Sequence, residues 1–290
     1  MNATPEGSPL LVARSGFRLP SPAPGVMAIL NVTPDSFSDG GVHFDHAKAV
    51  HAALQMEEDG AALIDIGGES TRPGSEGVSA EVEMERVVPV IEQIRRRSGV
   101  PISIDTTKAA VADAALGAGA NVINDVSALR ADPAMAPLAA RSGVPVILMH
   151  MRGSPRTMQQ HIHYDDVVRD VGCELAEFRE GAVAAGIDRG CILIDPGIGF
   201  AKTYEHNLEV LARLGELAAI APLVVGASRK AFIGHLTGRE AGPDRAAGSL
   251  AAVAAAHRAG AALVRVHDVR QTVDFLNVLQ AIDAHRRRSS

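Results

Sequence analysis

Polar residues able to bind ligands or catalyse reactions recur directly after short apolar runs along this chain. They comprise Asn31, Glu69–Arg72, Asp105, Asn124–Asp125, His150, Asp195, Ser228–Lys230 and Arg265–Asp268. Carboxylates accept paired N–H donors, amides both donate and accept, and guanidinium groups fit phosphate oxygens. One such residue commonly caps the helix that follows a strand, but so many in succession exceed the needs of capping. The pattern therefore indicates a ring of hydrogen-bonding groups around one mouth.

The elements that must position these residues alternate regularly. Strand-length apolar runs lie at Val26–Leu30, Leu63–Ile66, Ile102–Ile104, Val122–Ile123, Val146–Met149, Ile192–Ile194, Leu223–Val225 and Leu263–Val266. Continuous apolar character is expected of parallel strands that are buried on both faces. Helical spacing separates the runs, at Ala47–Glu58, Val82–Arg97, Lys108–Leu116, Ala134–Ala140, Tyr164–Ala185, His206–Leu214, Arg245–Ala259 and Thr272–Ala284.

This rhythm predicts an α/β fold, a (β/α)8 TIM barrel, in which the C-terminal ends of all strands share one catalytic face. A doubly wound open sheet is the alternative, but no GxGxxG motif follows the first strand. Residues 1–25 hold five prolines and are expected to form a short irregular lead-in. Residues 26–290 are then expected to form one catalytic domain, because no linker or composition shift divides them.

The composition narrows the classes of function. Among 290 residues, 47% are hydrophobic, and the net charge of −6 leaves no broad basic field to hold nucleic acid. No apolar stretch is uninterrupted enough to predict a membrane span. Cys173 and Cys191 do not form a CxxC pair, so we expect buried free thiols and a cytoplasmic location.

Several of these segments together resemble the signature segments of the dihydropteroate synthase family, in the family's order. They are Asn31–Gly41, Gly67–Gly74, Ile104–Lys108, Ile123–Ser127, Met149–Gln159, Asp195–Phe200, Ser228–Lys230 and Arg265–Val269. The resemblance spans essentially Val26 to Ala284. It implies a transferase of folate biosynthesis that condenses 6-hydroxymethyl-7,8-dihydropterin pyrophosphate with 4-aminobenzoate, giving 7,8-dihydropteroate and pyrophosphate. Ala201 stands where the family commonly has glycine, a departure expected to be harmless.

The resemblance implies a pterin site formed by Asp105, Asn124, Met149, Asp195, Phe200, Gly226 and Lys230. Asp195 would accept from the pterin amino group and its neighbouring ring N–H, and Lys230 would donate to ring acceptors. Asp105 would stabilise a cation that spreads over the ring. The pattern alone is equally consistent with Asp105 as a helix cap and Asp195 as a turn residue, and it leaves open an exposed loop position for Lys230.

A second cluster, Thr71, Arg72, Arg265 and His267, resembles the family's diphosphate site. Asn31, through its carbonyl oxygen, resembles the contact to Mg²⁺, which usually keeps waters and substrate phosphates as its other ligands. The implied catalytic residues are Asp105, Lys230, Arg265 and His267, with no general base. The alternatives are an ion pair of Arg265 with Asp268 or another acid at the rim, and a packed His267.

The segments Asn31–Phe44 and Gly67–Ser79 exceed the usual strand-to-helix connection and are expected to be lids. By resemblance, Phe37, Thr71, Pro73 and Ser228 form the 4-aminobenzoate site, the target of sulfonamides, and the chain forms a homodimer through barrel helices. Three other functions stay open: a pterin-binding methyltransferase, a Schiff-base aldolase using Lys230, and a paralogue that binds without turnover.

Overall fold

The computed structural model describes residues 17–33, 46–70, 77–154, 156–159, 162–240 and 242–288. The predicted site residues Phe37, Thr71, Arg72 and Pro73 lie outside these ranges. Most of the expected lid in Asn31–Phe44, and the centre of the one in Gly67–Ser79, also lie outside them.

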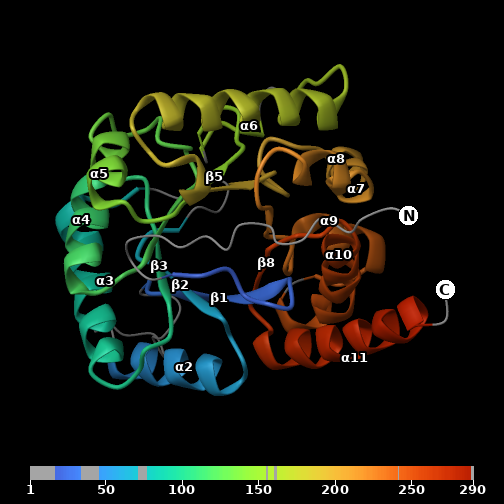
Figure 1. The fold of residues 1–290 in the computed structure, drawn as a ribbon, viewed down its shortest axis with the longest axis horizontal. Helices are drawn as coiled ribbons and strands as arrows, with labels where there is room; N and C mark the ends of the chain where they lie inside the picture. Colours follow the sequence, from blue (N-terminus) through green and yellow to red (C-terminus); the bar gives the residue numbers. More distant parts are fainter. Residues whose placement is uncertain are drawn as a thin grey trace.

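Eight parallel strands form the centre of the molecule (Figure 1). They are β1 (Gly25–Asn31), β2 (Leu63–Gly67), β3 (Ile102–Asp105), β4 (Val122–Asp125), β5 (Val146–Met149), β6 (Ile192–Asp195), β7 (Val224–Val225) and β8 (Leu263–Val266). Each strand pairs with its sequence neighbours, and β1 also pairs with β8. An isolated parallel bridge between Ile194 and Leu223 joins β6 to β7. The predicted (β/α)8 barrel is therefore confirmed.

Helices surround the strands on all sides in Figure 1. They are α2 (His46–Glu58), α3 (Ala80–Arg95), α4 (Ala109–Ala118), α5 (Met135–Ser142), α6 (Val167–Ala184), α7 (Tyr204–Ala212), α8 (Leu214–Ala218), α9 (Ala231–Thr237), α10 (Ala246–Arg258) and α11 (Val269–Arg288), with 3-10 turns η1 (Arg189–Cys191) and η2 (Gly242–Arg245). The eight predicted helices all form. Two details differ: Arg213, at φ −115°, divides the expected helix His206–Leu214 into α7 and α8, and α9 was not predicted.

Left-handed glycines end helices α4 and α5. Gly119 closes α4 with φ 114°, and Gly143 closes α5 with φ 65°. Glycine adopts this conformation without the steric cost that a Cβ atom imposes. The short connection after such a helix leads directly into the next parallel strand. The C-terminal ends of all the strands therefore lie on one side of the barrel.

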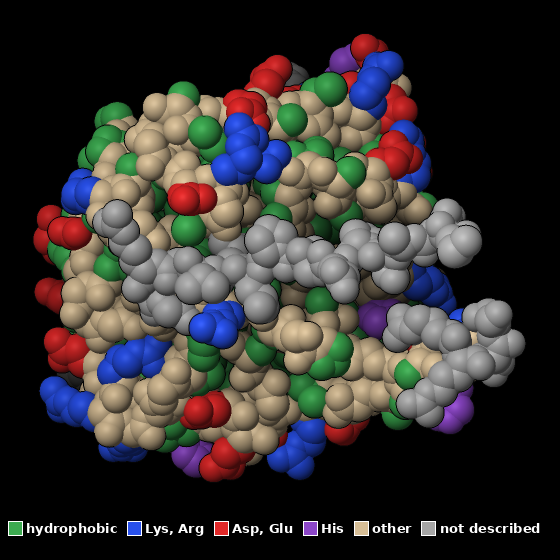
Figure 2. Space-filling model, in the orientation of Figure 1, with side chains coloured by type: hydrophobic (Ala, Val, Ile, Leu, Met, Phe, Trp, Pro, Cys, Tyr) green, Lys and Arg blue, Asp and Glu red, His purple; other side chains and the backbone are tan. Residues whose placement is uncertain are grey.

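The apolar core lies between the strands and the helices, because the strands are buried on both faces. Cys191 is buried as expected, but Cys173 is exposed, because it lies on the outer face of α6. Acidic and basic side chains are interspersed on the face seen in Figure 2. Among the helices in the described part of the chain, none has the length and apolarity needed to cross a bilayer.

Candidate active site

A guanidinium group bridges two buried carboxylates inside the barrel mouth. Arg265 on β8 donates from Nε to Asp65 Oδ2 at 2.6 Å and from Nη2 to Asp105 Oδ2 at 2.7 Å. Asp65 is fully buried and Asp105 is 9% exposed. Burial raises the pKa of Asp105, and the neighbouring Arg265 opposes that rise. The three side chains come from β2, β3 and β8, which places them at one end of the barrel.

Asp65 was not among the predicted site residues, because it lies inside the apolar run Leu63–Ile66 and was assigned to the strand core. Its carboxylate also accepts from Ser103 Oγ at 2.6 Å and from Asn124 Nδ2 at 3.1 Å. A buried acid needs such partners, because an unpaired charge in the interior is costly. The available signal was the presence of one ionisable residue within an otherwise apolar strand.

A second wall of the mouth carries Asp195 and Lys230. Asp195 ends β6, and its Oδ1 accepts from Gly197 N at 2.7 Å. Its other oxygen, Oδ2, lies 3.5 Å from where a Cβ atom on Gly226 would stand. Burial raises the pKa of Asp195, and the backbone N–H of Gly197 and the charge of Lys230 oppose the rise. Asp195 thus both stabilises its turn and keeps a second oxygen near the strand ends of β6 and β7.

Lys230 is not the exposed loop lysine considered as an alternative. Its ammonium lies 4.3 Å from the centroid of the Phe200 ring, a cation–π contact. Burial lowers its pKa to about 8, aided by the charge of Arg265 and opposed by Asp195. Met149, the last residue of β5, is buried in an apolar cluster against which Phe200 packs. A flat heterocycle would therefore meet polar groups at its edge and apolar groups at its face.

The helix-capping alternative for Asp105 is wrong. Lys108 occupies the N-cap of α4 without a side-chain cap bond, and Ala109 N donates instead to Asp132. The ion pair considered for Arg265 does form, but with Asp65 and Asp105 and not with Asp268, which pairs with Arg229. Arg265 instead joins the carboxylates within the barrel.

His267 and Ser228 lie together at the ends of β8 and β7. His267 Nδ1 is 3.0 Å from Ser228 Oγ, and His267 N donates to the same oxygen at 3.2 Å. Burial lowers the pKa of His267 to about 4, and the charges of Arg229 and Arg265 contribute to this decrease. The imidazole is consequently neutral at pH 7 and can act as a hydrogen-bond donor rather than a cation.

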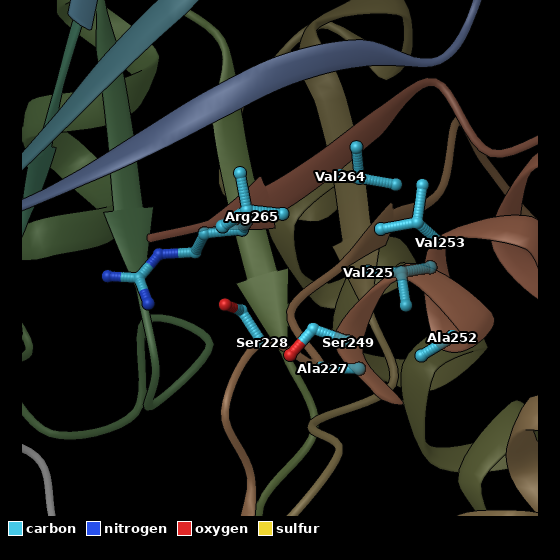
Figure 3. A pocket seen from close by; sticks show the side chains of 9 residues that line it. Val225, Ala227, Ser228, Ser249, Ala252, Val253, Val264 and Arg265 are labelled. Atoms are coloured by element: carbon cyan, nitrogen blue, oxygen red, sulfur yellow. The ribbon is translucent and has the colours of Figure 1, made fainter. Parts of the chain in front are cut away.

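A small, mainly apolar pocket lies behind Ser228, between the last two strands and α10. Figure 3 shows that the guanidinium of Arg265 extends away from the valine side chains that line it. The lining residues are Val225, Ala227, Ser228, Ser249, Ala252, Val253, Val264, Arg265 and Val266. The polar chemistry therefore lies on the other side of β8 from this pocket, towards Asp65 and Asp105.

Asn31 is the last residue of β1 and pairs in register with Gly67 on β2. It is partly buried at the mouth. Its side-chain amide oxygen is a ligand of the kind that Mg²⁺ prefers. The described residues contain no group of three His, Cys, Asp or Glu side chains placed to hold a metal. The donor set at Asn31 thus fits a cation whose remaining ligands would be substrate oxygens and water.

The structure brings together most of the predicted pterin residues. Asp105, Asn124 and Arg265 share one hydrogen-bonded cluster around Asp65. Asp195, Phe200, Gly226 and Lys230 form a second wall, which meets the cluster where Gly226 lies between Asp195 and Arg265. A barrel with convergent carboxylates, an amide and two cations at one mouth defines a class of enzyme suited to a polar, flat, anionic substrate.

Comparison with known proteins identifies the family. The family described as "Pterin binding enzyme" matches residues 27–267. Dihydropteroate synthase of Escherichia coli (strain K12) is 48% identical over 260 residues, 89% of this chain and 91% of that protein. The enzyme of Mycobacterium leprae (strain TN) is 48% identical over 265 residues, 88% of this chain and 92% of that protein.

Solved structures agree with this assignment. Xanthomonas albilineans dihydropteroate synthase in complex with 7,8-dihydropteroate superposes with a TM-score of 0.86 at 47% identity, covering 95% of this chain and 99% of that one. The Yersinia pestis enzyme with a sulfonamide drug gives a TM-score of 0.88 at 45% identity, covering 94% and 98%. The chain belongs to the dihydropteroate synthase family.

Proposed function

We propose that this barrel mouth carries out the dihydropteroate synthase reaction. The chain is a transferase that condenses 6-hydroxymethyl-7,8-dihydropterin pyrophosphate with 4-aminobenzoate, giving 7,8-dihydropteroate and pyrophosphate in folate biosynthesis. One observation of the site carries the proposal: Arg265 joins Asp65 and Asp105, and a Cβ atom on Gly226 would lie 3.8 Å from Arg265 and 3.5 Å from Asp195 Oδ2. Donor and acceptor groups of the kinds that complement the edge of a pterin thus lie together at one mouth of the barrel.

Polar side chains form hydrogen bonds with the edge of the pterin ring, and apolar side chains pack against its face. The carboxylate of Asp195 accepts from the exocyclic amino group and from the adjacent ring N–H, since a carboxylate can accept two parallel donors at once. Lys230 donates to the ring carbonyl, and Asn124, which both donates and accepts, reads the neighbouring edge. Phe200 and Met149 provide the apolar contact that excludes water from the ring.

The bond that breaks joins the pterin methylene carbon to the diphosphate oxygen. Its electron pair leaves with the diphosphate, and the amine nitrogen of 4-aminobenzoate supplies the pair for the new C–N bond and then loses a proton to water. Asp105 stabilises the positive charge that develops on the pterin. Arg265, beside it, opposes the rise in the pKa of Asp105 and so helps keep the carboxylate negative. Arg265 also offers positive charge to the diphosphate, together with the N–H of neutral His267.

Mg²⁺ is the proposed metal, with Asn31 as its protein ligand through the amide oxygen. When bound, it would neutralise charge on the leaving diphosphate. Thr71 and Arg72 are proposed as further diphosphate ligands. Phe37, Thr71, Pro73 and Ser228 are proposed for 4-aminobenzoate, and sulfonamides, found on the Yersinia pestis relative, are expected to compete there.

We propose a homodimer and a cytoplasmic location as well. Val278 and Ile282, one turn apart on α11, are 62% and 46% exposed, and a second copy would cover this apolar part of a barrel helix. Two cysteines without a disulfide agree with a reducing compartment. Sedimentation equilibrium of the wild-type chain tests the dimer directly.

The assay that tests the function supplies both substrates and Mg²⁺ to the purified chain and measures pyrophosphate and 7,8-dihydropteroate. We expect equal amounts of the two products, with none when 4-aminobenzoate is omitted. Asp195→Ala should weaken pterin binding at least ~10-fold, as loss of a charged hydrogen-bond acceptor does. Absence of turnover, or methyl transfer to or from a reduced pterin instead, would overturn the proposal. Borohydride trapping at Lys230 would favour the aldolase.

A further inference from the structure

A second buried lysine lies next to the pterin wall and has no role in the chemistry above. Lys202 is 3% exposed, and its ammonium contacts three acceptors: His150 Nδ1 at 3.0 Å, Gly197 O at 3.2 Å and Phe200 O at 3.2 Å. An ammonium has three N–H donors, so these contacts use all of them. The arrangement is complete without any ligand, which argues against a role as nucleophile.

The other acceptors of Lys202 belong to the segment that carries the pterin contacts. Gly197 N donates to Asp195 Oδ1 at 2.7 Å, so the carboxylate orientation depends on where Gly197 lies. Phe200 presents its ring to Lys230. Lys202 thus holds the carbonyls at both ends of the turn Gly197–Phe200, whose closure is marked by Phe200 N donating to Gly197 O at 3.1 Å.

His150 orients Lys202 from behind. The imidazole is fully buried, and its Nε2 lies 3.1 Å from Glu174 Oε2 on α6. Arg152 Nε donates to the other oxygen of Glu174 at 2.8 Å. Because Nδ1 faces an ammonium, it must accept, and Nε2 then carries the proton towards Glu174. A chain of four side chains, Arg152–Glu174–His150–Lys202, therefore connects the outer helix α6 to the pterin wall.

Burial lowers the pKa of Lys202 to about 7, and the charges of Asp195 and Glu174 oppose this decrease. The partners assign the protons, because a carboxylate and two backbone carbonyls can only accept. Burial lowers the pKa of His150 to about 4, and the charge of Lys202 contributes to this decrease, so the imidazole is neutral. The hydrogen bond from His150 lowers the pKa of Glu174 to about 2, and Arg152 adds to this effect. Glu174 is therefore ionised and fixes the tautomer of His150.

The Gly197–Phe200 turn is tightly packed against its neighbours. A Cβ atom on Gly197, at φ 67°, would lie 2.0 Å from His150 O. Gly199 N donates to Asn207 Oδ1 at 2.6 Å on α7. Loss of the ammonium would leave Phe200 O and His150 Nδ1 without a donor, while Gly197 O would keep only the bond from Phe200 N.

We propose that Lys202 is a positioning residue of the pterin site, which fixes the Gly197–Phe200 turn so that Asp195 and Phe200 meet the pterin ring. His150 orients Lys202 through a hydrogen bond, and Glu174 in turn orients His150. This proposal rests on the proposed function. It does not include a direct contact between Lys202 and substrate.

The test replaces Lys202 by methionine, which keeps the length and removes the donors. The probes are 6-hydroxymethylpterin, which reports the ring site without the diphosphate, and turnover of both substrates. We expect Lys202→Met to bind 6-hydroxymethylpterin at least ~10-fold more weakly and to raise the KM for the pterin substrate by a similar factor. The KM for the aromatic amine at saturating pterin should change less than ~3-fold, because the affected wall touches only the pterin.

Val90→Ala on α3 is the matched control, since it removes packing from a fully buried position in the other part of the core. It should lower the melting temperature without changing pterin affinity. If Lys202→Met does not fold, Glu174→Gln, which keeps the shape, should produce a smaller increase in the same pterin KM. Wild-type affinity in a folded Lys202→Met, or equal increases in both KM values, would overturn the inference. Inactivity of the wild type would instead overturn the proposed function.

Discussion

Nη2 of Arg265 donates to Oδ2 of Asp105 at 2.7 Å, across the barrel from β8 to β3. The same guanidinium donates from Nε to Asp65, so one cation serves two carboxylates that lie within the interior. Burial would lower the pKa of Arg265, but the charges of Asp65 and Asp105 raise it. The cluster therefore connects three strands in addition to its proposed role in binding, and the two roles can be separated by substitution.

Arg265→Met should lower both stability and turnover. Two buried carboxylates would lose their cation, and breaking a buried ion pair costs about 3–5 kcal/mol. Urea unfolding would measure this loss, and pyrophosphate release should fall at least ~100-fold. Arg265→Lys keeps the charge but cannot bridge both acids, so it should recover part of the stability and little of the turnover. Near-normal turnover of Arg265→Met would contradict both the cluster and its role with the diphosphate.

His267 should behave as a neutral donor. Its pKa of about 4 lies below the value of 6.5 for an unfolded histidine. As pH falls from 6.5 towards 4, the unfolded chain gains a proton at this site while the folded chain does not, so stability decreases. Between pH 7 and 5, wild type should lose about 2 kcal/mol more unfolding free energy than His267→Gln.

The same pair of proteins separates charge from hydrogen bonding in catalysis. Gln places an N–H near the position of Nε2, so His267→Gln should keep more turnover than His267→Ala at pH 7.5. Nitrogen chemical shifts of the His267 ring, followed against pH, give the protonation state directly. A midpoint above 6.5, or equal turnover in the two variants, would show that the imidazole acts as a cation or not at all.

Most of the architecture could be predicted because buried strands and helices give recurring patterns of apolar residues in the sequence. The eight apolar runs and the residues that follow them, such as Asp105 and Asp195, lie where the barrel pattern requires. Asp65 and Lys202 were not assigned roles, because each depends on partners far away in the chain: Arg265 is 200 residues from Asp65, and His150 is 52 residues from Lys202. The local pattern of apolar and polar residues indicates which positions are buried. It does not indicate which distant residue a buried polar side chain contacts, and this is known only from the three-dimensional structure.

The short helix α9 was missed for a different reason. Ala231–Thr237 contains two apolar residues that are buried, Phe232 and Ile233, within only seven residues. Such a segment is too short for helical periodicity to stand out from a loop. It matters for function, because Lys230 is its N-cap residue and the preceding turn places Arg229 at φ 57°.

Lys230 should give the enzyme a descending activity limb at alkaline pH. Its pKa of about 8 lies below the usual 10.5, so the ammonium loses its proton as pH rises through 8. The neutral amine no longer offers charge to the ring acceptors, so kcat/KM for the pterin substrate should fall towards ~10-fold per pH unit. Lys230→Arg, which stays protonated, should have lower activity without this limb. Persistence of the limb in Lys230→Arg would assign it to another group.

Ala201, where the family commonly has glycine, adopts φ 48° and is 2% exposed. A left-handed alanine costs about 1–2 kcal/mol, so Ala201→Gly relieves strain. The same change removes a buried methyl group worth about 0.8 kcal/mol and adds freedom to the unfolded chain worth about 0.5–1 kcal/mol. These effects offset one another, and Ala201→Gly should change the unfolding free energy by less than about 1 kcal/mol. Ala201→Val, whose branched side chain resists this backbone conformation, should cost more than about 2 kcal/mol. Urea titration of the three proteins decides: a tolerated valine would mean that residue 201 is not left-handed, and a large gain with glycine would mean that strain dominates.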